Sequence, residues 1–203
     1  MPGRVVLGAR DRRLLAEADA VIGVDEVGRG ALAGPVVVCA ARFETIPVDG
    51  GVRDSKVLTA KQREGTLARV LRESSGWAIC EIGPEVIDHI NILEATRLAM
   101  RASALSLTGP SSVVITDHVA PGDLGCRVLS PVRADRDYFC VAAASIIAKV
   151  HRDRIMVAMG RWDPRWGWQS NKGYGTAAHR AALDRWGPSP SHRLSFSWTP
   201  VRS

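Results

Sequence analysis

The chain has 203 residues, of which 46% are hydrophobic and 24% are charged, and this length and balance fit one domain with a single core. No apolar segment reaches the roughly 18 residues that a transmembrane helix requires, and the N-terminal apolar run is too short for a signal peptide. Lys and Arg outnumber Asp and Glu by 27 to 21, which favours a polyanionic partner such as nucleic acid, although an ordinary soluble basic surface explains the charge equally well. We therefore expect one cytoplasmic domain over residues 1–203 with no membrane attachment.

The order of predicted helices and strands indicates an α/β fold. Helices are predicted where apolar residues recur every three or four positions, and strands where short β-branched runs are bounded by turn residues. In chain order these are a helix over 10–19, strands over 20–24 and 36–41, a helix over 59–73, a strand over 77–82, a helix from 91 to about 105, strands over 112–116 and 126–132, and helices over 138–159 and roughly 176–186. The first two strands are tightly joined and should pair antiparallel. The Pro- and Trp-rich tail from 161 onward is expected to form loops around the last helix.

Four acidic residues lie where predicted elements begin or end. Asp25 and Glu26 end the first strand, Asp117 ends the fourth, and Asp135 precedes the long helix. Hard cations such as Mg²⁺ take carboxylate oxygens, and a pair of ions can clamp the attacking and leaving oxygens of a phosphodiester. Ordinary surface carboxylates at strand ends explain such spacing more often than a metal site does. Spacing alone therefore leaves the site a hypothesis.

The segment Gly28-Arg29-Gly30 follows the acid pair directly. Glycines on either side of an arginine let the backbone approach a ligand closely, while the arginine supplies charge. A simple glycine-rich turn between paired strands is the alternative, and the neighbouring acids favour the functional interpretation.

Several ordered motifs of this sequence resemble the ribonuclease HII family. They run from residue 25 to 196 in the family's order and comprise Asp25-Glu26-Val27-Gly28-Arg29-Gly30, Asp54-Ser55-Lys56, Asn91-Ile92-Leu93-Glu94-Ala95-Thr96, Ala142-Ala143-Ala144-Ser145-Ile146-Ile147-Ala148-Lys149-Val150, Arg152-Asp153-Arg154, Lys172-Gly173-Tyr174-Gly175-Thr176 and His192-Arg193-Leu194-Ser195-Phe196. So many motifs in one order make a chance resemblance very improbable.

The resemblance implies an RNase H-like fold, with a mixed five-stranded sheet flanked by helices, and an endonuclease that cuts the RNA strand of RNA/DNA hybrids. It further implies nicking 5′ to single ribonucleotides in duplex DNA, with 5′-phosphate and 3′-hydroxyl products, by two Mg²⁺ or Mn²⁺ ions in the substrate complex. The implied metal-binding and catalytic residues are Asp25, Glu26, Asp117 and Asp135. The implied substrate-binding residues are Gly28, Arg29, Gly30, Lys56 and Tyr174, which suits a protein that reads the 2′-hydroxyl. An ordinary solvated lysine is an equally good interpretation of Lys56.

The chain departs from the family pattern at three positions. His118 stands where glycine is usual, Asn171 where histidine is common, and Asp137 where lysine is frequent. Asp137 leaves the catalytic assignment open between itself and Asp135, and the spacing to the following helix favours Asp135. His118 either assists proton transfer or is an ordinary loop residue, and the latter is favoured.

Two rival functions remain at this stage. A non-catalytic module would bind hybrids without cutting them, and a transposase-like nuclease would cut DNA that lacks ribose. The intact acids oppose the first, and Gly28-Arg29-Gly30 with Tyr174 oppose the second. A monomer is the default, and a sliding-clamp contact stays open.

Overall fold

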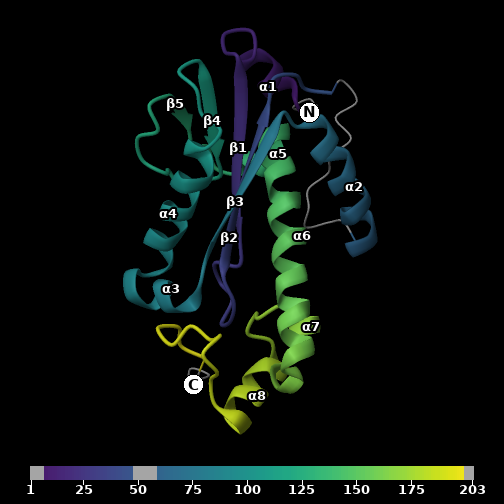
Figure 1. Ribbon diagram of the computed structural model, residues 1–203, viewed down its shortest axis with the longest axis vertical. Coiled ribbons are helices and arrows are strands. Elements are labelled where there is room, and N and C mark those ends of the chain that lie inside the picture. Colours follow the sequence, from purple (N-terminus) through teal and green to yellow (C-terminus); the bar gives the residue numbers. More distant parts are fainter. Residues whose placement is uncertain (1–6, 48–58, 199–203) are drawn as a thin grey trace, which may run out of the picture.

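The computed structural model describes residues 7–47 and 59–198, which build one five-stranded sheet with helices on both faces (Figure 1). The strands are β1 (Ala20–Val27), β2 (Val36–Phe43), β3 (Gly76–Ile82), β4 (Ser112–Thr116) and β5 (Arg127–Leu129), in the order β3-β2-β1-β4-β5. β1 pairs antiparallel with β2 and parallel with β4, while β3 is antiparallel to β2 and β5 parallel to β4. The predicted mixed sheet and its antiparallel first pair are confirmed.

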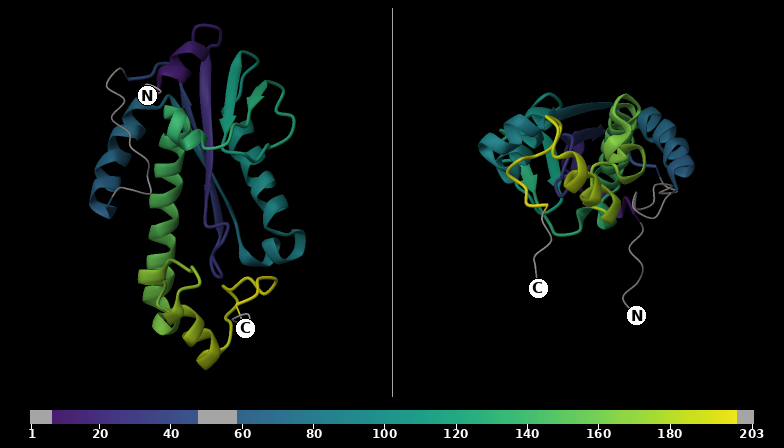
Figure 2. Two further views of the ribbon diagram at one scale, coloured as in Figure 1. Left: turned by 180° about the vertical axis from the view of Figure 1, so that it is seen from behind. Right: turned by 90° about the horizontal axis from the view of Figure 1, so that it is seen from below.

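The longer helices cover the sheet as two unequal layers. The helices of the described residues are α1 (Ala9–Leu14), α2 (Ala60–Glu73), α3 (Pro84–Ile90), α4 (Ile92–Leu105), α5 (Ala134–Asp137), α6 (Phe139–Trp162), η1 (Pro164–Trp166), α7 (Trp168–Asn171) and α8 (Ala177–Trp186). Seen from below, α3 and α4 lie on one side of the sheet, and α6 with α2 outside it lies on the other (Figure 2). The larger core lies between α6 and the sheet, and a second core lies under α4. No helix of the described residues is long and apolar enough to cross a bilayer.

α6 packs unusually close to the central strand. A Cβ atom on Gly23 of β1 would lie 2.0 Å from the carbonyl carbon of Cys140, so only glycine fits there. The run Ala142–Ala144 keeps the helix surface flat at this level and is fully buried. Buried Asp11 accepts hydrogen bonds from the backbone N–H groups of Phe139 and Cys140, at 2.9 and 3.0 Å, and so caps the start of α6. The helix is thereby fixed along the strand that carries Asp25 and Glu26.

Some elements differ in extent from the prediction, and others were not predicted. The helix expected over 10–19 ends at Leu14, and Gly83-Pro84, a pair typical of a break, instead starts α3 with Pro84 in its first turn. Proline is well tolerated there because its missing N–H would have no intrahelical partner. The tail also contains η1 and α7, which the loop prediction did not include.

The tail packs on the far end of α6 and on the loop after β1. Trp166 and Trp168 are 2% exposed and stack with ring centroids 5.1 Å apart, whereas Trp162 is 91% exposed. Isolated bridges pair Ala31 with Tyr174 and Ala33 with His192. The tail therefore closes over the segment that follows the acid pair of β1.

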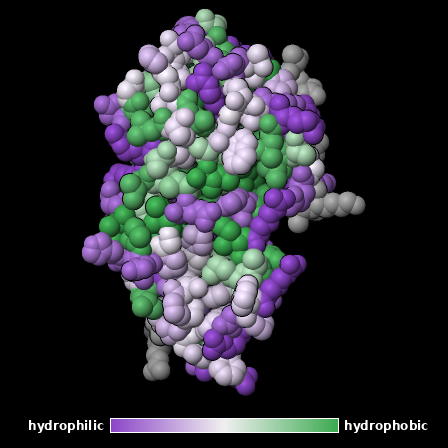
Figure 3. All heavy atoms as spheres, viewed as in Figure 1, coloured by the Kyte–Doolittle hydropathy of each residue, from purple (hydrophilic) through white to green (hydrophobic). Residues whose placement is uncertain are grey.

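The outer surface is mixed rather than dominated by one kind of side chain. Figure 3 shows hydrophobic and hydrophilic residues interspersed on the face of Figure 1, with hydrophobic surface most evident across its middle. Exposed leucines of α4, at positions 93, 98 and 105, contribute to the apolar surface of the molecule.

Candidate active site

A cleft of about 470 Å³ lies at the end of β1 and β4. Parallel pairing places Val24 opposite Thr116, so Asp25 of β1 and Asp117, the residue after β4, lie at the same level. The cleft is lined by Asp25, Glu26, Val27, Gly28, Arg63, Asp117, Ser145, Lys149 and Tyr174. Three of the four predicted acids therefore meet Gly28 and Tyr174 in one cavity.

Asp25 is buried, Glu26 is half-buried, and neither carboxylate is fully neutralised by a neighbouring cation. Burial, and then the charge of Glu26, raises the pKa of Asp25 to about 8, although a hydrogen bond from Ser145 acts in the opposite direction. Burial also raises the pKa of Glu26, against the charge of Arg29, whose Nη1 lies 3.2 Å from Glu26 Oε1. The other oxygen, Oε2, is buried with no hydrogen-bond partner. Such a carboxylate is costly to leave without a partner.

The remaining acids approach from two other elements. Asp117 Oδ1 accepts a hydrogen bond from the backbone N–H of Ala134 at 3.2 Å, which ties β4 to the start of α5. Asp135 is 4% exposed, and its charge contributes to the raised pKa of Asp25, although it does not line the cleft. Asp137 instead forms an ion pair with Arg10 at 2.9 Å and is one-third exposed. Its surroundings match the site less well than those of Asp135.

These acids suit a hard cation without forming a complete cage. Within residues 7–47 and 59–198, no group of three or more His, Cys, Asp or Glu side chains is arranged to hold a metal ion. The unpartnered Oε2 of Glu26 and the raised pKa of Asp25 nevertheless indicate carboxylates that lack positive charge. Carboxylate oxygens are the ligands that Mg²⁺ and Mn²⁺ prefer. The donor set therefore fits such an ion.

The two glycines of the Gly28-Arg29-Gly30 segment differ in what the fold demands of them. Gly28 has φ 89°, and a Cβ there would lie 2.1 Å from Nε of Arg152. The φ of Gly30 is not positive, and a Cβ placed on it would meet no atom within 4 Å. The fold therefore explains Gly28, and leaves Gly30 free for close approach by a ligand. Lys56 lies outside the described residues.

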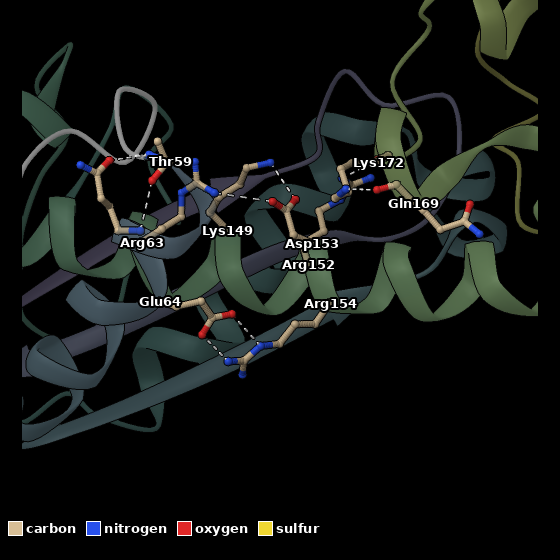
Figure 4. Close-up of polar contacts among 10 residues, drawn as sticks. Thr59, Arg63, Glu64, Lys149, Arg152, Asp153, Arg154, Gln169 and Lys172 are labelled. Atoms are coloured by element: carbon tan, nitrogen blue, oxygen red, sulfur yellow. Dashed lines mark hydrogen bonds and ion pairs between the residues drawn. The ribbon is translucent and has the colours of Figure 1, made fainter.

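Three polar side chains of the cleft were not predicted as site residues. Ser145 and Lys149 lie one turn apart on α6, and Arg63 reaches the cleft from α2. Asp153 forms ion pairs with the two basic side chains, at 2.7 Å to Lys149 Nζ and 3.8 Å to Arg63 Nη1 (Figure 4). The four-residue spacing of 145, 149 and 153 was the available signal.

His118 is exposed, does not line the cleft and adopts φ 63°. The left-handed conformation accounts for glycine being usual at this position, since glycine takes it without strain. The structure thus agrees with the favoured interpretation of an ordinary loop residue.

The family comparisons agree with the geometry. The family model described as ribonuclease HII matches residues 22–199. A ribonuclease HII of Cereibacter sphaeroides is 46% identical over 177 residues, covering 87% of this chain and 83% of the relative. The structure of the PCNA:RNase HII complex from Archaeoglobus fulgidus is similar at 26% identity and a TM-score of 0.74, over 86% of this chain and 92% of that one. Bst-RNase HIII in complex with Mn²⁺ shares the fold, at 20% identity and a TM-score of 0.71, over 93% of this chain and 70% of that one.

Proposed function

The chain belongs to the ribonuclease HII family, whose members cleave the RNA of RNA/DNA hybrids, and on that premise we propose that it also nicks duplex DNA 5′ to a single embedded ribonucleotide. The products would carry a 5′-phosphate on the ribonucleotide and a 3′-hydroxyl upstream. One observation carries this proposal: the acidic pair of β1 and the aspartate that follows β4 share a single cleft with Gly28 and Tyr174. The residues proposed for phosphodiester cleavage thus lie beside those proposed to recognise the sugar.

Asp25, Glu26, Asp117 and Asp135 would hold Mg²⁺ or Mn²⁺. Two such ions, when bound with substrate, supply the positive charge that activates water and neutralises the reacting phosphodiester. Without a cation, a pKa of about 8 keeps most Asp25 molecules protonated at pH 7. Binding of a cation by this carboxylate would therefore release a proton.

The other side chains bind and orient the nucleic acid. Arg63 and Lys149 line the same cleft as the carboxylates and can contact phosphate oxygens. Gly28, Arg29 and Gly30 would approach the 2′-hydroxyl and phosphate at the cut, and Tyr174 would pack on the next sugar. The 2′-hydroxyl is the group that separates RNA from DNA at one site. We propose that the chain does this as a monomer, with Lys56 as a further phosphate contact.

Cleavage of a labelled duplex that carries one ribonucleotide tests this function. The reaction is run with Mg²⁺, Mn²⁺ or EDTA, beside an all-DNA duplex and the Asp117→Asn variant. We expect metal-dependent nicking of the ribonucleotide strand alone, lost in the variant. Tight binding without cutting would favour a non-catalytic module, and equal cutting of the all-DNA duplex would sink the role given to the Gly28-Arg29-Gly30 segment and Tyr174.

A further inference from the structure

Two arginines, Arg152 of α6 and Arg193 of the tail, are completely buried. They lie beside residues 28–35, the loop after β1 that is proposed to recognise the substrate. Within the described residues no carboxylate forms an ion pair with either guanidinium. Burial lowers the pKa of both, and the charge of Arg152 lowers that of Arg193 further. The charge of Asp153 raises the pKa of Arg152 and that of Asp88 raises the pKa of Arg193, but neither acid forms an ion pair with the guanidinium, so the hydrogen-bond partners have to compensate for the burial.

The partners are backbone carbonyls from two separate segments. Arg152 donates to the carbonyls of Pro35, Ala33 and Lys172 at 2.9, 3.0 and 2.8 Å. Its guanidinium also lies 5.4 Å from the ring centroid of Tyr174. One side chain therefore joins the loop after β1 to the segment that carries Tyr174.

Arg193 completes the same connection from the other side. It donates to the carbonyl of Arg29 at 2.8 Å and, through two nitrogens, to that of Gly34 at 2.9 and 3.1 Å. Phe196 lies 5.1 Å from its guanidinium, measured to the ring centroid. Both ends of residues 29–35 are thus attached to a buried guanidinium.

α6 links this connection to the catalytic acids. Ser145, which hydrogen-bonds Asp25, precedes Arg152 by seven residues on the same helix. Seven residues are about two turns, or roughly 10 Å along the axis, and place both side chains on one face. The helix therefore sets the distance between the carboxylates and the loop that Arg152 holds.

We propose that Arg152 and Arg193 are positioning residues which fix residues 28–35 and Tyr174 at one distance from the catalytic carboxylates, and so set the preference for ribose over deoxyribose. The inference rests on the proposed function of that loop. Neither arginine lines the cleft, so each acts through the backbone it holds. A lysine would keep the charge but lose the planar fork that reaches several carbonyls at once.

The test measures binding to two duplexes of one sequence, with and without a single ribonucleotide, in an Asp117→Asn background that prevents cutting. Fluorescence anisotropy gives the ratio of the two Kd values for the parent, Arg152→Lys and Arg193→Lys. We expect the preference for ribose to fall at least fivefold in each variant, with affinity for the all-DNA duplex within twofold of the parent. A fall in the preference at constant affinity for the all-DNA duplex would show that the loop has moved, whereas a loss of phosphate contacts would weaken binding of both duplexes.

Two further variants keep the test decisive if a lysine variant does not fold. Phe196→Leu loosens Arg193 without removing a hydrogen bond and should reduce the preference in the same direction. Met100 of α4 is buried in the core on the opposite face of the sheet, so Met100→Ala should lose thermal stability but retain the full preference.

The outcomes distinguish the two proposals. A parent that prefers ribose, with variants that prefer it equally, overturns the positioning role alone. A parent that binds both duplexes equally overturns the proposed function, and the positioning role with it. Equal loss of preference in Met100→Ala would show that any destabilisation has this effect, and would overturn the inference as well.

Discussion

Two regions of the site differ in how completely their polar groups are paired. The carboxylate end comprises Asp25, Glu26, Asp117 and Asp135, and the recognition end comprises residues 28–35 and Tyr174 with the side chains that hold them. At the carboxylate end, Glu26 Oε2 has no partner and Asp25 has a strongly raised pKa. At the recognition end, Arg152 and Arg193 donate six hydrogen bonds to backbone carbonyls, counting three from each. The first region is incomplete without a cation, whereas the second is complete in the protein itself.

Two buried, neutral histidines also have hydrogen-bond partners within the recognition end. His179 and His192 are buried with their Nε2 atoms 3.1 Å apart, and Trp168 Nε1 donates to His179 at 3.2 Å. His179 Nδ1 lies 3.0 Å from the Tyr174 carbonyl oxygen. Burial lowers the pKa of both rings, that of His192 to about 4, so they stay uncharged at neutral pH. Rigidity on one side and unpaired charge on the other suggest a preformed sugar site beside a cation-dependent reaction site.

The largest effect is expected from Asp25→Asn, which should lower the cleavage rate by roughly a thousandfold or more because the carboxylate set acts as a unit. The same change should stabilise the fold above pH 5 in EDTA. Raising the pKa from 3.8 to about 8 makes the folded state hold a proton that the unfolded state releases, so stability present below pH 4 is lost as pH rises to 8. Asparagine avoids this loss, on the order of 1 kcal/mol per pH unit.

Urea unfolding of both proteins at pH 4, 6 and 8, beside rate measurements, checks this prediction. Asp137→Asn is the matched control, because it removes a partly exposed ion pair with Arg10. It should keep the cleavage rate and change the free energy of unfolding by no more than about 1 kcal/mol. Equal inactivation by Asp137→Asn would show that the choice of Asp135 as the catalytic residue is wrong.

The next largest effect separates two glycines of the recognition end. Gly28→Ala should reduce stability by about 1–3 kcal/mol, because its φ is 89° and Arg152 occupies the space of a Cβ. Gly30→Ala should change stability by no more than about 0.5 kcal/mol, yet reduce cleavage about tenfold if the substrate approaches its backbone. Thermal unfolding and initial rates provide the measurements. Full activity in Gly30→Ala would remove close approach as the reason for glycine at that position.

The sequence predicted the carboxylate end better than the recognition end. Strand ends can be located from apolar runs, and parallel β1 and β4 bring Asp25 and Asp117 to one edge. The choice between Asp135 and Asp137 could not be made from charge, because both are aspartates and only their surroundings differ. All four acid assignments stay predictions until they are tested in solution.

The recognition end depends on contacts that sequence pattern hides. Buried arginines contradict the usual exposure of that residue type, so Arg152 and Arg193 gave no signal as core residues. Five of their six hydrogen bonds go to backbone carbonyls more than 100 residues away in the chain, which no local periodicity records. Pro84 misleads in the opposite way, since a residue that indicates a break begins a helix here.

A gain in stability should follow from adding the cation itself. Mg²⁺ or Mn²⁺ at about one hundred times its Kd should stabilise the fold by about 3 kcal/mol, if it binds only the folded state. Glu26→Gln should abolish most of this gain, because it replaces the carboxylate that carries the unpartnered oxygen with a neutral amide, which binds a hard cation more weakly. Unfolding curves with and without metal give the stabilisation, and calorimetry in two buffers of different ionisation enthalpy gives the released proton. Absence of proton release at pH 7 would contradict the raised pKa of Asp25.

The smallest effect is expected where the two regions meet, at Asp153. Asp153→Asn weakens the hold on Lys149 and Arg63, so we expect KM for a hybrid to rise about two- to fivefold with kcat within twofold. Glu64→Gln is the matched control, since it breaks the Arg154 pair at an exposed position (Figure 4) and should leave both constants unchanged. A fall in kcat with constant KM would instead place Lys149 and Arg63 in the reaction step, because interactions made only in the transition state appear in kcat. The boundary of the carboxylate end would then extend onto α6 as far as Asp153.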